Sequence, residues 1–229
     1  MNSTRMIAVM TSVAFIVATG ANLVGAALTP ALSGADYMAQ FAAHGTQVAA
    51  GAILYLIAAF ASVGIAVLMY PILKERNGVL SLGSVVFRAL EAAFYLVGVV
   101  CLLALRSLSQ QILTSDAVDT LSRLAVGGAL VSVHDHAGLV AVFAFCLGAA
   151  MYYAVLYQSR IIPRWLSGAG LVAVALMMTA CMLSLLSGRP ITSYIPLAAP
   201  IGLQEMVLAV WLIAKGFSPA AVVGIAADS

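Results

Sequence analysis

Charged side chains are scarce in this chain of 229 residues, in which they make up only 8%. A soluble domain carries about 25% charged residues, so water cannot solvate the surface of this chain on all sides. The net charge is only +2, and no basic cluster interleaved with aromatic residues occurs, which excludes nucleic acid as a partner. The scarcity of charge therefore favours a membrane protein.

Cysteines and catalytic motifs are also few. Cys101, Cys146 and Cys181 all lie in apolar stretches, and an odd number of such thiols is no disulfide framework. The chain contains no nucleophile motif, phosphate-binding loop, dinucleotide fingerprint or zinc-protease signature. The sequence thus identifies no catalytic residue and no cofactor, and it does not favour an enzyme.

Long hydrophobic runs are what the chain has instead, with 64% hydrophobic residues and a mean hydropathy of +1.12. Six stretches approach the roughly 20 residues that cross about 30 Å of hydrocarbon. They lie near residues 6–28, 47–73, 81–105, 137–157, 165–187 and 196–214. Because the runs are continuous and do not alternate, they predict helices. We expect an all-α polytopic membrane bundle with six transmembrane helices in a single domain, 1–229.

The distribution of lysine and arginine predicts the orientation, because cytoplasmic loops are enriched in these residues. One side of the predicted bundle holds Arg5, Lys74, Arg76, Arg160, Arg164 and Lys215, and the other holds Arg106, Arg123 and Arg189. Both termini should therefore be cytoplasmic, in a multi-pass protein of the cell's inner (plasma) membrane.

The outer connection 106–136 is long enough for structure of its own. In it, Asp116, Asp119 and Arg123 lie opposite Val118 and Leu121, with Asp119 and Arg123 four residues apart. This pattern predicts a short amphipathic helix on the outer surface of the membrane. A shorter one is expected at about 36–41.

A polar stripe runs along the third predicted span. Ser84, Arg88, Glu91 and Tyr95 recur at helical spacing and share one face, which should point into the bundle. At about 1.5 Å per residue, Arg88 lies roughly 12 Å and Glu91 roughly 16 Å from the cytoplasmic edge, while Glu205 lies roughly 14 Å from the outer edge. All three charged residues reach the middle of the membrane, so they can meet.

The charges in this stripe do not balance. Arginine stays protonated, so Arg88 supplies one positive charge against the two carboxyl groups of Glu91 and Glu205. One glutamate should pair with Arg88, and the other should be protonated or meet a cation. These residues, with Tyr95 and Ser84, form a candidate site that binds or moves a small cation, a proton or an amphipathic ligand.

Two other interpretations stay open. Buried ion pairs also fix which helices pack together, so the chain could be a structural or accessory protein that contacts a partner membrane protein. Asn22, Tyr55, Ser62 and Tyr70 are expected to be interhelical hydrogen-bonding groups of this kind.

The three histidines, His44, His134 and His136, map to the outer side, with Asp135 between the last two. They raise the hypothesis of a metal-dependent intramembrane hydrolase. However, two residues that are two apart in a helix point in opposite directions, and a metal needs three or four converging ligands. Helix capping and a pH-sensitive contact are the alternatives.

Several short segments of the chain, taken in their order and spacing, resemble a known protein family. They are residues 63–74 at the end of the second span, 87–92 in the third, 157–166 between the fourth and fifth, and 204–205 and 211–212 in the last. With these segments the chain resembles the bacterial membrane proteins grouped as domain of unknown function 4386. The resemblance implies a multi-span bacterial inner-membrane protein in a lipid bilayer. It assigns no activity and no catalytic residue.

Overall fold

The computed structural model describes residues 3–34, 36–112 and 117–218. Within these ranges the chain is helical and contains no strand. The helices are α1 Ser3–Leu28, α2 Tyr37–Ala43, α3 Gly45–Leu73, α4 Gly78–Ile112, α5 Ala117–Ser159, α6 Arg164–Ser187, the short 3₁₀ helix η1 Ile191–Tyr194, and α7 Ile195–Ala214. Six of the described helices are long and apolar enough to cross a membrane. The all-α bundle predicted from the sequence is confirmed, and the chain is a multi-pass membrane protein.

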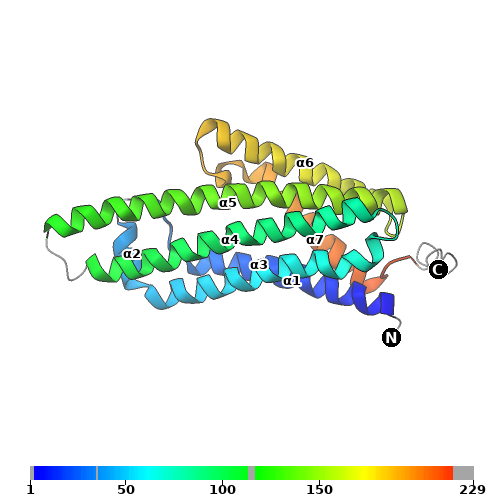
Figure 1. Cartoon of the computed structure of the whole chain (residues 1–229), viewed down its shortest axis with the longest axis horizontal. Helices are drawn as coiled ribbons and strands as arrows, with labels where there is room; N and C mark the ends of the chain where they lie inside the picture. The colour runs from blue at the N-terminus through cyan, green and yellow to red at the C-terminus, as the bar shows by residue number, and fades with distance from the viewer. Residues whose placement is uncertain (1–2, 35, 113–116, 219–229) are drawn as a thin grey trace.

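The six spans form a closed ring. Each packs against two neighbours, in the order α1, α3, α4, α5, α6, α7 and back to α1. Figure 1 shows them running along the long axis of the molecule. Helix α6 diverges from α5, and the separation is largest at the C-terminal end of α6. Because the ring is closed, a side chain on the inner face of any span can point into a shared interior.

Local sequence signals set the ends of these spans. Asn77 accepts a hydrogen bond from the Leu80 amide through its side-chain oxygen at 3.0 Å, which caps the start of α4. Pro163 precedes α6, where its fixed φ suits a helix start. Gly188 ends α6 in the left-handed conformation, with φ of 66°, which glycine adopts without a Cβ penalty.

The start of α1 and the end of α7 lie at the same end of the bundle (Figure 1). Near the start of α1, Arg5 donates hydrogen bonds to the carbonyls of Leu212 and Ile213, where α7 ends. A cation is favourable at a helix C-terminus. We call this the termini end, and the opposite end the far end.

The far end differs from the sequence expectation. Helix α4 continues to Ile112 and α5 already begins at Ala117, so the described parts of 106–136 extend two spans and do not form a separate surface helix. The segment contains no proline to stop either helix. Its polar side chains connect the two extensions, since Arg123 donates to Gln111. Asp116 lies outside the described residues.

The shorter helix expected at 36–41 is present as α2, at the far end (Figure 1). Its Met38 and Phe41 are buried in a cluster with Leu102 and Leu105 of α4. This contact holds the connection between α1 and α3 against the extended part of α4.

Candidate functional site

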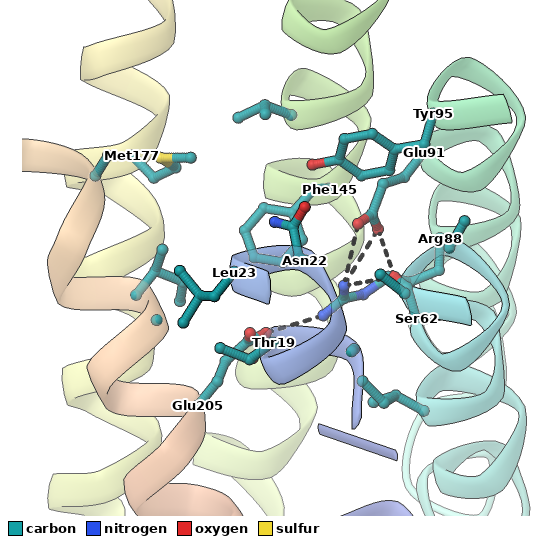
Figure 2. Close-up of a pocket in the computed structure, with 18 of the residues that line it drawn as sticks. Thr19, Asn22, Leu23, Ser62, Arg88, Glu91, Tyr95, Phe145, Met177 and Glu205 are labelled. Atoms are coloured by element: carbon teal, nitrogen blue, oxygen red, sulfur yellow. Dashed lines mark hydrogen bonds and ion pairs between the residues drawn. The ribbon is translucent and has the colours of Figure 1, made fainter. Parts of the chain in front are cut away.

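The three charged residues that the sequence placed at mid-membrane meet inside the ring. Arg88 and Glu91 of α4 are buried, at 3% and 4% exposed. The Nη1 atom of Arg88 lies 3.2 Å from Oε2 of Glu91, and its Nη2 atom lies 3.0 Å from Oε1 of Glu205 on α7. Figure 2 shows the guanidinium between the two carboxylates. One cation therefore serves two anions from two helices.

Ser62 of α3 completes a triangle with the first pair. Its hydroxyl accepts a hydrogen bond from Nη1 of Arg88 at 2.9 Å and donates one to Oε2 of Glu91 at 3.0 Å. A hydroxyl can do both, because it carries one donor and two acceptor lone pairs. Ser62 was expected to be an interhelical hydrogen-bonding group, and it is one.

Helix α5 supplies the aromatic side of the site. The Tyr152 hydroxyl donates to Oε1 of Glu205 at 3.2 Å and accepts from Nη2 of Arg88 at 3.5 Å. The Arg88 Cζ atom lies 4.5 Å from the ring centroid of Phe145, within the range of a cation–π contact. We call Ser62, Arg88, Glu91, Tyr152 and Glu205 the charge cluster.

One carboxylate oxygen of this cluster accepts no hydrogen bond from a described side chain. Arg88 and Tyr152 both bond to Oε1 of Glu205, and in the described part of the chain no side chain bonds to its Oε2. The Glu205 side chain is 12% exposed, more than either Arg88 or Glu91. If both carboxyl groups are ionised, one positive and two negative charges leave one negative charge in excess.

Four members of the cluster, all except Tyr152, form part of the wall of a cavity of about 250 Å³, which residues from all six spans line. Much of the lining is apolar, including Ala58, Ala59 and Met177. Since a water molecule occupies about 30 Å³ in the liquid, the space suits a few waters or one small molecule. Drug-sized ligands usually take about 300 Å³ or more.

Tyr95 and Ser84, the other two predicted site residues, have different positions. Tyr95 lines the cavity, and Figure 2 shows its hydroxyl pointing into it. Ser84 is buried away from the cavity and donates to the carbonyl of Ser81 at 2.7 Å. A serine in a helix readily bonds back to its own backbone, and its short side chain does not reach the cluster one turn away.

Gln204 stays apart from the charge cluster, as its helical position predicts. It accepts a hydrogen bond from the Tyr153 hydroxyl and donates to the Leu166 carbonyl at 3.0 Å. These contacts connect α5, α6 and α7 next to the cluster.

Sequence reasoning missed Tyr152 and Phe145. They are seven residues apart, which places them on one face of α5, but nothing in that apolar span distinguishes this face from the others. The useful signal was the pair Tyr152–Tyr153, since a buried tyrosine hydroxyl usually needs a partner.

The histidines do not converge. Each ring nitrogen Nδ1 contacts a backbone carbonyl: His44 that of Gln40 at 3.0 Å, His134 that of Gly98 at 3.0 Å and His136 that of Ser132 at 2.7 Å. Among the described residues, no three His, Cys, Asp or Glu side chains are grouped so that they could hold a metal ion. The hydrolase hypothesis needs such a group, and the described residues do not show one.

Comparison with known proteins gives one match. The model of a family described as "Domain of unknown function (DUF4386)" matches residues 6–216. No curated protein and no solved structure matches the chain.

Proposed function

The chain belongs to this family of unknown function, so its activity must be argued from its own residues, and we propose that it binds a small protonated amine in the central cavity. The ammonium group sits against Oε2 of Glu205, and the alkyl part lies against the apolar walls. The observation that carries the proposal is that two carboxylates share one guanidinium at the wall of a cavity.

The excess charge supports a cationic ligand. An uncompensated charge in the middle of a bilayer costs a few kcal/mol even on the mildest scale. A monovalent cation beside Glu205 neutralises the one negative charge that Arg88 leaves over. Such a ligand therefore binds more strongly here than a neutral molecule of the same shape.

The lining supports an organic ammonium ion over a metal cation. Hard cations such as Ca²⁺ and Mg²⁺ take six or more oxygen ligands. Much of the lining here is apolar, and it includes the aromatic residues Tyr55, Tyr95 and Phe145, a residue type that attracts alkylammonium groups.

A purely structural role is the second candidate. Ser62, Tyr152 and both Nη atoms of Arg88 are hydrogen-bonded within the protein, as expected if the cluster only fixes helix packing. The chain would then be an accessory protein with a membrane-protein partner. The free Oε2 of Glu205 and the cavity beside it favour the binding role.

The test compares ligand-induced stabilisation of purified protein in lipid nanodiscs. Trimethylammonium chloride should raise the unfolding temperature of the wild type above that in NaCl of equal ionic strength, because a ligand that binds only the folded state stabilises it. Glu205→Gln should abolish this response. Glu75→Gln, which changes a glutamate that is 39% exposed in the turn before α4, should retain it.

Equal responses to trimethylammonium and sodium in the wild type would reject the amine. Potentiometric titration would then compare proton uptake by the wild type and by Glu205→Gln. Uptake of an additional proton by the wild type would identify a proton-binding site. If neither ligand binds, the structural role is left.

The distribution of basic residues over the bundle supports a proposal for its location. We place both termini in the cytoplasm and the protein in the inner membrane, because Arg5, Lys215 and the turns at 74–76 and 160–164 group at the termini end. A C-terminal reporter that is active only in the cytoplasm should be active in the fusion. Activity of a periplasm-specific reporter at the same position would reverse the orientation.

A further inference from the structure

Tyr95 stands where three hollow spaces meet. It lines the central cavity, a side cavity of about 110 Å³ between α4 and α5, and a third space of about 510 Å³ at the far end. We call the third space the vestibule. Its walls come from α5 near His134, from the last turns of α6, and from the segment that follows α6 as far as Thr192.

The vestibule and the central cavity share walls. Asn22, Tyr95, Val142 and Met177 line both. His134, Asp135, His136 and Arg189 also line the vestibule, so it carries polar and charged side chains of its own. A charged solute in the vestibule would therefore meet polar groups before it reaches the charge cluster.

The other side of the cluster is closed. Toward the termini end, the interior is filled by Ile65, Met69, Tyr153, Leu208 and Leu212, none of which is more than 1% exposed. The Tyr152 and Tyr153 rings are in tilted contact, with 4.3 Å between their centroids and 43° between their planes, and the hydrogen bonds of Gln204 connect this layer to α6. Among the described residues, this buried layer separates the charge cluster from the termini end.

We infer that the charge cluster is reached from the far end only, through the vestibule, and that the Tyr95 side chain is the threshold between vestibule and cavity. The amine as the occupant and the preference for the vestibule over a route from the bilayer rest on the proposed function, whereas the connection between vestibule and cavity rests on their shared walls. With the termini in the cytoplasm, the site takes its ligand from the periplasmic side.

A lateral route from the bilayer is the competing possibility. Leu23 of α1 and Gly202 of α7 also line the central cavity, and Leu23 is 66% exposed on the outside of the bundle. The vestibule is favoured because the cluster needs a charged ligand, and charged groups cross the hydrocarbon poorly.

Cysteine labelling distinguishes the routes. The three native cysteines are buried, and they are replaced by alanine. Single cysteines are then introduced as Met177→Cys in the shared wall, Ser184→Cys in the vestibule and Ser12→Cys in the first half of α1, where Ser12 is 0% exposed. The reagent is 2-(trimethylammonium)ethyl methanethiosulfonate, which is cationic and does not cross membranes. It is applied to vesicles in which the orientation of the protein is known from a C-terminal tag on the protein.

The reagent should modify Met177→Cys and Ser184→Cys only from the side opposite the tag, and Ser12→Cys from neither side. Tyr95→Ala should increase the modification rate at position 177 several-fold, and Tyr95→Phe, which keeps the ring, should not. If the variant without native cysteines does not fold, the labels are located by mass spectrometry in the wild-type background.

Modification of position 177 from the tag side would overturn the inference, as would modification only by a lipid-soluble maleimide. Far-end labelling without stabilisation by trimethylammonium leaves the route intact and rejects the proposed ligand. Stabilisation without far-end labelling retains the ligand and rejects the route.

Discussion

The Nη2 atom of Arg88 donates to Oε1 of Glu205 at 3.0 Å, which connects residues 117 positions apart. Their helices, α4 and α7, stand opposite each other in the ring and are not neighbours in it. The bond therefore spans the interior, and the same guanidinium also reaches Ser62 of α3 and Tyr152 of α5. One side chain thus connects four of the six spans.

Removal of this guanidinium should be strongly destabilising. Arg88→Met leaves the carboxyl groups of Glu91 and Glu205 in the interior without a counter-charge. Breaking a buried ion pair on one side costs about 3–5 kcal/mol, and we expect a loss of this size. Reversible unfolding in mixed micelles measures the free energy of unfolding.

The matched control removes all three charges together. Arg88→Met combined with Glu91→Gln and Glu205→Gln leaves no unpaired charge, so it should recover much of the lost stability. If the triple variant is no more stable than Arg88→Met alone, unpaired carboxylates are not the cause of the loss.

Ser62→Ala should weaken the cluster, since the Ser62 hydroxyl bonds to both Arg88 and Glu91. Leaving a buried polar group unsatisfied costs about 1–3 kcal/mol. Ser84→Ala is the control, because Ser84 is equally buried and bonds only to the Ser81 carbonyl of its own helix. Thermal unfolding should separate the two, and equal losses would contradict a special role for Ser62.

The sequence was sufficient to predict six long apolar helices and the meeting of the charged residues inside the bundle. Continuous apolar runs locate membrane helices because lipid demands them, and counting from each membrane edge placed Arg88 and Glu205 at one level. The structure brings these two together. Depth depends only on position along the helix, which a sequence gives directly.

The rotation of each helix could not be predicted in this way. Helix α5 carries apolar residues on every face, so the sequence does not show that its Tyr152 and Phe145 face Arg88. The stripe on α4 predicted two further site residues, Tyr95 and Ser84. Tyr95 lines the cavity, whereas the short side chain of Ser84 bonds to the backbone of its own helix. The polar pattern at 106–136 suits a surface helix and a pair of extended spans equally well, and only packing between α4 and α5 decides it.

Gly170→Ala should disturb the contact between α5 and α6. A Cβ at this position would meet the ring of Tyr153, which its hydrogen bond to Gln204 holds in place. Overpacking of this kind costs about 1–3 kcal/mol. Gly64→Ala, where a Cβ meets no atom within 4 Å, should be neutral or stabilising. Thermal unfolding of both variants measures the difference, and a neutral Gly170→Ala would contradict this packing.

The two adjacent tyrosines give a pair of variants that separates binding from stability. Tyr152→Phe removes a donor to Glu205, whereas Tyr153→Phe removes a donor to Gln204, outside the charge cluster. Both lose one buried hydroxyl, so both should lose some stability. Only Tyr152→Phe should change the stabilisation by trimethylammonium, measured as a shift in unfolding temperature. A change in both would mean that the response reports stability and not the site.

Gly202→Val tests whether the cavity itself is where the ligand binds. Gly202 lies one helical turn from Glu205 on the same face of α7, and a Cβ there meets no atom within 4 Å, since it points into open space. Valine should therefore fit without a clash and occupy part of the cavity.

Gly64→Val is the control, because it places the same β-branched residue in a span at a position that also meets no atom and does not line the cavity. We expect Gly202→Val to lose the stabilisation by trimethylammonium while its unfolding temperature without ligand matches that of Gly64→Val. A full response in Gly202→Val would mean that the ligand binds elsewhere, because the volume beside Oε2 of Glu205 is no longer free.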